Sequence, residues 1–272
     1  MTIVKPRAII VNGYGINCDR ELAYAFLTAG AEVELVHLDE LIADPKILRT
    51  YAQILGLPGG FSFGDDTFAG NIFAKKIKYS GLRDELERYL QEGNLLFGVC
   101  NGNQIGSVMN LISVFDEVFS DPEMVYTNNK SGRYEDRGNI HLKVVSHKSH
   151  WLDGIDVLHN IPVGHGEGQF YATPRVLDEL YKRGLVALKY VNADGTPANG
   201  MYPVNPNGAM DDIAGLASET VIMMMPHFER AMRPINQDGW TRRKSALRRQ
   251  GLALPEEGDG MKIFRNGVKY FE

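Results

Sequence analysis

The 272-residue chain has few cysteines, no excess of positive charge and no long apolar run. Its two cysteines, Cys18 and Cys100, are too few for a disulfide framework, which predicts a reducing, cytoplasmic location. A formal net charge of −5 argues against nucleic acid as the main partner. No apolar run approaches the roughly 18 residues of a membrane span, and residues 1–7 lack the apolar core of a signal peptide. We therefore expect neither a nucleic acid nor a membrane as a partner.

Signals for a bound cofactor or metal are also weak. The chain has no Gly-x-x-x-x-Gly-Lys-Ser/Thr phosphate loop, so any ATP chemistry is expected on another chain. The turn that begins at Gly13 nearly spells a dinucleotide fingerprint, but Cys18 stands at its third glycine position, which favours a plain tight turn. Asp65 and Asp66 lack a third ligand at suitable spacing, so a solvated or helix-capping role is favoured over a metal site. We expect no cofactor and no metal on this chain.

Strands and helices alternate over the first 112 residues. Strands are predicted at 8–11, 32–38, 54–57 and 95–99, several of them apolar on both faces. Helices are predicted at 41–51, at 71–92 as one long helix, and after Asn17 as the cap of another. This alternation predicts an α/β protein with a mostly parallel central sheet and helices on both faces. Ligands of such folds bind at the carboxyl ends of the strands.

The second half of the chain is less regular. Residues 113–140 are polar and rich in turn formers, which predicts an inserted hairpin or loop region. Further strands are predicted at 141–146, 185–191 and 221–225, a helix at 175–183 and a long loop at 193–207. Five cations between Arg242 and Arg249 favour a solvated helix face, with a docking surface for a synthetase or a phosphate contact as the alternative.

The most informative segment surrounds Cys100. The apolar strand 95–99 runs straight into this cysteine, with Gly98 and Gly102 two residues to either side. A nucleophile elbow has this pattern, because its tight strand-to-helix turn accepts only small residues at those two positions. The helix that follows points its positive end at the sulfur, which favours the thiolate. A buried cysteine followed by a loop is the weaker alternative. We therefore predict a nucleophilic Cys100.

A base and an orienting group are needed to activate such a nucleophile. His227 follows the apolar strand 221–225, and Glu229 comes two residues later. Both would lie at the carboxyl end of a strand, on the same edge of the sheet as Cys100. A carboxylate so near a histidine can hold its tautomer and stabilise the imidazolium, although a single histidine more often has a structural role.

Gly59 and Gly60 form a glycine turn at the end of another predicted strand. Backbone N–H groups there and at Asn101 could bind the oxyanion of a tetrahedral intermediate. A plain structural turn is the competing interpretation.

Together these motifs resemble those of the class I (triad) glutamine amidotransferases. Within them, the chain closely resembles the glutaminase components of phosphoribosylformylglycinamidine synthases, over nearly its whole length. The segments that carry this closer resemblance are residues 17–21, 57–65, 100–104, 165–168, 202–208 and 224–227.

The resemblance implies a flavodoxin-like fold, one glutamine amidotransferase domain over residues 1–272, and a C-terminal extension at 232–272. It implies that glutamine is hydrolysed through a cysteinyl thioester and that the ammonia passes to an ATP-dependent synthetase. The implied partners are that large synthetase subunit, which would hold ATP and Mg²⁺, and an optional small accessory subunit.

The resemblance also assigns roles to residues. Cys100 would be the nucleophile, His227 its base and acid, and Glu229 the partner of the histidine. Gly60 and Asn101 would form the oxyanion hole. The amino and carboxylate ends of glutamine would be held by Gln104 and by the backbone near His165 and Gly166.

Two positions depart from the family pattern. Phe228 replaces a proline, and Phe68 replaces an expected arginine. Two other functions are alternatives. A PfpI-like cysteine hydrolase would place a histidine directly after the cysteine, where this chain has Asn101. A catalytically silent regulatory subunit would not need Cys100, His227 and Glu229 together.

Overall fold

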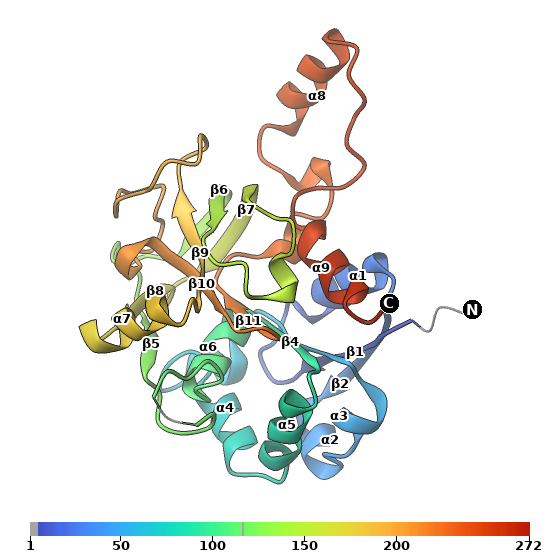
Figure 1. Cartoon of the computed structure of the whole chain (residues 1–272), viewed down its shortest axis with the longest axis vertical. Helices are drawn as coiled ribbons and strands as arrows, with labels where there is room; N and C mark the ends of the chain where they lie inside the picture. The colour runs from blue at the N-terminus through green and yellow to red at the C-terminus, as the bar shows by residue number, and fades with distance from the viewer. Residues whose placement is uncertain (1–4, 116) are drawn as a thin grey trace.

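A nine-stranded sheet forms the centre of the molecule (Figure 1). The computed structural model describes residues 5–115 and 117–272, so part of the N-terminal segment tested for a signal peptide, and residue 116, lie outside it. The strand order is β2-β1-β3-β4-β11-β10-β9-β6-β7. Its strands are β1 (Arg7–Asn12), β2 (Glu32–His37), β3 (Ile54–Leu57), β4 (Leu95–Val99), β6 (Glu135–Val144), β7 (Val157–His165), β9 (Val186–Val191), β10 (Ile213–Ala217) and β11 (Val221–Met224).

The sheet has a parallel half and an antiparallel half. Strands β2, β1, β3, β4 and β11 are parallel neighbours, whereas β11, β10, β9, β6 and β7 pair antiparallel. The centre of the parallel half is apolar on both faces, since β3 and β4 are buried at every position, whereas the edge strand β2 is largely exposed. The predicted α/β fold is confirmed, and the antiparallel half extends it.

Residues 113–140 are more ordered than the sequence suggested. They contain β5 (Met124–Thr127), which pairs with β8 (Gln169–Ala172) in a separate two-stranded sheet. They also contain the beginning of β6, which belongs to the central sheet. The expected hairpin or loop region therefore supplies the first part of a strand to the main sheet; four of its six positions at 135–140 are partly or fully exposed, which accounts for their polar character.

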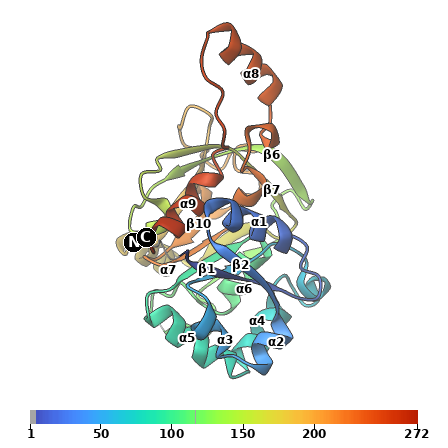
Figure 2. The ribbon, with the colours of Figure 1, turned by 90° about the vertical axis from the view of Figure 1, so that its right-hand side faces the viewer.

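Helices cover both faces of the sheet (Figures 1 and 2). On one face α1 (Asp19–Ala29) packs against α9 (Met261–Lys269). On the other face α6 (Asn101–Val108) packs against α4 (Asn71–Lys78), which also contacts α5 (Leu82–Gln91). The remaining helices are α2 (Leu38–Ala43), α3 (Ile47–Tyr51), α7 (Pro174–Lys182) and α8 (Trp240–Arg249). Within the described ranges, no helix is both long and apolar enough to cross a membrane.

Three helix predictions need correction. The single helix predicted at 71–92 is two helices, α4 and α5, because the chain turns at 79–81, where Gly81 precedes the second helix. The helix predicted at 41–51 is also two short helices, with Pro45 between them. Asn17 does not cap α1: Cys18 occupies the cap position and makes no side-chain cap bond.

The C-terminal end of the predicted extension belongs to the core. The ring of Phe264 on α9 lies 5.0 Å from that of Phe26 and 5.1 Å from that of Phe97. Trp151 completes this cluster, its ring 5.4 Å from that of Phe97. All four side chains are buried, so residues from α1, β4 and α9 share one apolar cluster on this face of the sheet.

Candidate active site

Cys100 lies on a strained turn between β4 and α6. Its φ of 52° and ψ of −110° are costly for a residue other than glycine, and such strain is typical of a nucleophile elbow. A Cβ atom at Gly102 would stand 1.9 Å from the carbonyl oxygen of Leu57, and one at Gly98 would stand 2.5 Å from Sδ of Met223. The crowding that the sequence predicted at these two glycines is therefore confirmed.

Strand pairing brings the histidine to the cysteine. β11 runs parallel to β4, with Met224 opposite Val99, and the Cys100 N–H donates to the Met224 carbonyl over 2.8 Å. The chain continues from β11 to His227, whose N–H donates to the Pro162 carbonyl over 2.7 Å. Both residues thus lie at the carboxyl edge of the parallel half, as the sequence predicted.

His227 and Glu229 form a buried pair. Glu229 lies in the short turn η4 (Phe228–Arg230), and one of its carboxylate oxygens is 2.5 Å from His227 Nδ1. Burial alone would lower the pKa of His227, but the Glu229 carboxylate and the neighbouring Cys100 thiol raise it above its ordinary value. Among the described residues, His227 Nε2 has no hydrogen-bond partner, so this nitrogen is available for the thiol proton. The His227–Glu229 pair therefore favours the protonated form of the imidazole.

Gly59 lies against both Cys100 and His227, where there is no room for a side chain. A Cβ atom there would stand 2.8 Å from His227 Cε1 and 3.3 Å from Cys100 Cβ. Any side chain at this position would push the histidine and the cysteine apart. The glycine turn predicted at 59–60 therefore has a steric role in the site in addition to any oxyanion role.

The segments that carry the two predicted oxyanion donors, Gly60 and Asn101, are hydrogen-bonded to each other near the elbow. Asn101 begins α6, where backbone N–H groups have no partner within the helix. The turn at Gly60 is fixed by bonds on both sides, from Cys18 N–H to Gly59 O (3.1 Å) and from Phe61 N–H to Gly15 O (2.8 Å). The Ser62 N–H also donates to the Asn101 side chain over 3.3 Å, which ties this loop to the elbow.

Gln104 contacts the turn at 165–168. Its side-chain N–H donates to the Glu167 carbonyl over 2.6 Å, and its Oε1 accepts from the Asn101 side chain over 3.0 Å. The carbonyls of His165 and Gly166 are already occupied, since Asn129 donates to them over 2.7 and 2.8 Å. Burial, then the proximity of His227, lowers the pKa of His165 to about 3, so this ring is neutral. The His165 ring therefore has a structural role beside the site.

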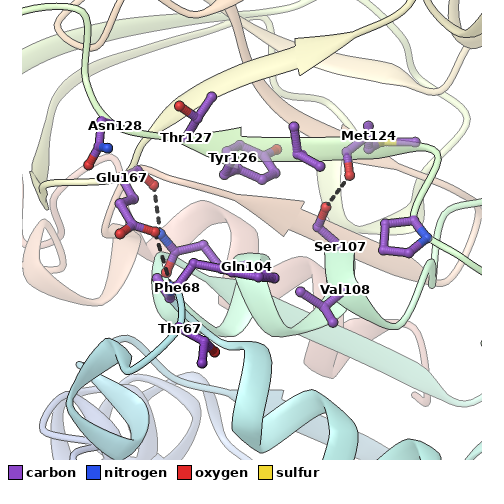
Figure 3. Close-up of a pocket in the computed structure, with 13 residues that line it drawn as sticks. Thr67, Phe68, Gln104, Ser107, Val108, Met124, Tyr126, Thr127, Asn128 and Glu167 are labelled. Atoms are coloured by element: carbon purple, nitrogen blue, oxygen red, sulfur yellow. Dashed lines mark hydrogen bonds between the residues drawn. The ribbon is translucent and has the colours of Figure 1, made fainter.

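Two carboxylates beside Gln104 were not predicted (Figure 3 shows Glu167). Glu167 accepts the Ala69 N–H over 3.0 Å and lines a cavity of about 390 Å³ that Gln104 and Phe68 also line. Asp65 is half-buried, not a solvated or capping residue, and lies 3.4 Å from the Asn101 side-chain nitrogen. Burial, then the nearby Glu167, raises the pKa of Asp65 to about 6. The only sequence signal for Glu167 was its place in the 165–168 motif.

Arg230 is a further unpredicted neighbour of the site. Its guanidinium donates to Cys18 Sγ over 2.9 Å. Cys18, His227 and Glu229 also have donor atoms within 4.8 Å of one another, an arrangement that could in principle hold a metal ion. The guanidinium against the sulfur disfavours a second cation there, and the His227–Glu229 bond already uses two of the three ligands. We interpret the cluster as acid–base machinery with a supporting cysteine.

The fold and this site define a cysteine hydrolase of the triad type on an α/β sheet. An elbow cysteine, a histidine from the neighbouring strand and a carboxylate bonded to that histidine are the three groups that acyl transfer requires.

The comparison with known families is specific. The chain belongs to the family of the CobB/CobQ-like glutamine amidotransferase domain, whose model matches residues 5–271. It is therefore a glutamine amidotransferase.

Individual relatives agree with this assignment. The chain is 39% identical to the phosphoribosylformylglycinamidine synthase subunit PurQ of Methanococcus maripaludis strain S2, over 100% of this chain and 99% of that protein. It is 36% identical to the subunit of the same name from Dehalococcoides mccartyi, over 98% of each chain. A chain in the structure of PurLQS from Thermotoga maritima matches with a TM-score of 0.69 and 26% identity, covering 99% of this chain and 100% of that one.

Proposed function

We propose that this chain is the glutaminase component of phosphoribosylformylglycinamidine synthase. It hydrolyses glutamine to glutamate and ammonia, and an ATP-dependent synthetase subunit uses the ammonia in purine biosynthesis. The observation that carries the proposal is the buried His227–Glu229 pair beside the elbow Cys100, in a chain whose full-length relatives bear that subunit's name.

The chemistry follows from the positions of the three groups. His227 Nε2 takes the thiol proton, and the sulfur of Cys100 attacks the carboxamide carbon of glutamine. The N–H groups of Gly60 and Asn101 receive the negative charge that develops on the carboxamide oxygen. His227 then returns the proton to the leaving nitrogen, which departs as ammonia and leaves a thioester. Water, deprotonated by His227, cleaves the thioester, so glutamate leaves and the thiol is restored.

The other end of the substrate would lie near Gln104. This residue is one helical turn beyond Cys100, about 6 Å along α6. Glu167 and Asp65 place negative charge there, and the ammonium group of glutamine is a cation of the right size and sign. We assign Gln104 and Glu167 to the recognition of the amino-acid end of glutamine, with Asp65 as the second negative group.

Glu167→Gln is expected to raise the KM for glutamine about 10- to 100-fold with little change in kcat. Loss of a hydrogen bond to a charged group costs about 1.5–3 kcal/mol, which corresponds to that range. Glutamine at 167 keeps an oxygen that can accept the Ala69 N–H, so the loop should keep its shape. The measurement is steady-state glutaminase kinetics, with the exposed Asp66→Asn as the matched control. An unchanged KM, or a loss confined to kcat, would contradict the assignment.

The function itself is tested by following the amide nitrogen. The chain is mixed with the synthetase subunit of its own organism, ATP, Mg²⁺, formylglycinamide ribonucleotide and glutamine labelled with ¹⁵N in the amide. We expect the label in the amidine product. The synthetase alone should form product from ammonium salts and none from glutamine. If the mixture uses ammonium salts and still cannot use glutamine, the proposal fails.

The remaining expectations are consistent with this role. ATP and Mg²⁺ are assigned to the synthetase subunit and not to this chain. Both cysteines are free, and a nucleophilic thiol is best preserved in a reducing compartment, so we propose a cytoplasmic location.

A further inference from the structure

Residues 233–257 leave the body of the protein as an arm that carries α8 (Figures 1 and 2). At its base, the Gly258 N–H donates to the Met232 carbonyl over 2.7 Å, and the Gly260 N–H donates to the Ala231 carbonyl over 3.1 Å. A Cβ atom at Gly258 would stand 2.2 Å from the Ala231 carbonyl oxygen, so the two ends of the arm are closely packed. The arm is therefore a defined projection with a fixed base.

The helix of the arm is strongly basic. Five of its ten residues are cations and none is an acid: Arg242, Arg243, Lys244, Arg248 and Arg249. Within the part of the chain that the structure describes, no ion pair involves any of the five. Without them the formal net charge of −5 would be −10, so α8 carries a concentrated charge opposite to the net charge of the rest of the chain.

The helix is also poorly packed, although it contacts the short turn η5 (Pro234–Asn236) at the base of the arm. None of its side chains is buried. Isolated helices shorter than about 12–15 residues are marginal in water, and most helices in proteins depend on a packed face. Apolar side chains near the helix are exposed as well: Ile235 by 74% before it and Leu252 by 53% after it. Arginine is enriched at protein interfaces.

We propose that the α8 arm is a docking element for an acidic surface of the synthetase subunit. The inference rests on the proposed function, which requires that subunit to lie close enough to receive ammonia. The arm is suitably placed, because its base at Ala231 directly follows η4, the turn that carries Glu229. A protein surface is favoured over RNA or DNA, because exposed apolar side chains flank the cations of the helix.

The test compares two charge-reversed forms of the full chain. Arg242→Glu with Arg248→Glu alters the arm, and Lys46→Glu with Lys75→Glu makes the same charge change on exposed positions of the body. Binding to the purified synthetase subunit is measured by titration at several salt concentrations. We expect the arm variant to bind about tenfold more weakly or worse and to lose most of the salt dependence, while the body variant binds like the wild type.

The outcomes separate the docking inference from the proposed function. Equal binding by the arm variant and the wild type overturns the inference, even if the wild type delivers ammonia normally. Failure of the wild-type chain to bind or supply the synthetase instead counts against the proposed function. Normal synthetase binding combined with loss of RNA binding would assign the arm to nucleic acid. Loss of self-association in sedimentation would assign it to a second copy of the chain. Each of these two results also overturns the inference.

Discussion

Cys100→Ser is expected to abolish glutamine-dependent synthesis by the complex, by about 10⁴-fold or more, while ammonia-dependent synthesis is retained. Loss of a catalytic nucleophile typically removes nearly all of the rate enhancement that a triad supplies. The synthetase needs only ammonia from this chain, so free ammonium salts should bypass the missing thiol. The measurement is product formation with glutamine and with ammonium chloride, side by side.

Cys18 is the rival nucleophile, because its sulfur also lies close to His227. Burial raises the pKa of Cys18 to about 12, with the Arg230 guanidinium opposing the shift, so this thiol is neutral at physiological pH. Cys18 also lacks the strained turn that presents Cys100. The structure therefore favours Cys100 on both electrostatic and geometric grounds.

Labelling separates the two cysteines. A diazo-ketone analogue of glutamine should modify Cys100 in the wild type and in Cys18→Ser, but should not modify Cys100→Ser. The site is identified by mass spectrometry of peptides from the complex. Modification of Cys18 in the wild type, or normal glutamine use by Cys100→Ser, would exclude Cys100 as the nucleophile.

The elbow could be predicted because its sequence pattern is local. An apolar strand, a cysteine and two flanking glycines lie within eight consecutive residues, although the atoms that crowd these glycines belong to the distant residues Leu57 and Met223. The position of His227 could be predicted because parallel strands end at one edge of a sheet, so an apolar strand followed by His-x-Glu indicates where the side chains will lie.

The residues that were missed depend on contacts between distant segments. Asp65 and Glu167 approach each other from positions about a hundred residues apart, and neither stands in a pattern that indicates charge near a substrate. Arg230 contacts Cys18 across more than two hundred residues. Periodicity and propensity describe neighbours along the chain, so they cannot reveal such contacts.

The errors in predicting helices and strands have a different cause. At 71–92 the missed signal is a change of face: the buried positions of α4 end at Ile77 and those of α5 begin at Leu82, five residues later, whereas one continuous helix would place the next buried position three or four residues on. In β6 the pairing shifts register twice, between Arg137 and Ile140 and again before Leu142, so strict alternation is lost. A strand with such irregularities resembles a loop in sequence although it is paired on both sides.

Glu229→Gln is expected to lower the kcat for glutamine hydrolysis by about 10³- to 10⁴-fold near neutral pH, with little change in KM. Replacement of a triad carboxylate by its amide has an effect of this size in hydrolases of the same type. Glu229 is buried behind His227, on the Nδ1 side of the ring, so it is not positioned to bind the substrate. The loss should therefore fall on the chemical step.

The physical reason is that burial and Glu229 shift the pKa of the His227 imidazole in opposite directions. Burial lowers the pKa of His227, and Glu229 is the largest influence that raises it. Glutamine fills the same space without the charge, so the pKa of the imidazole should fall and its hold on the thiol proton should weaken. The amide can also donate to Nδ1, which would place the remaining ring proton on Nε2, where the base must accept one. Ammonia-dependent synthesis by the same complex controls for folding and docking, and a kcat within a few-fold of the wild type would remove Glu229 from the triad.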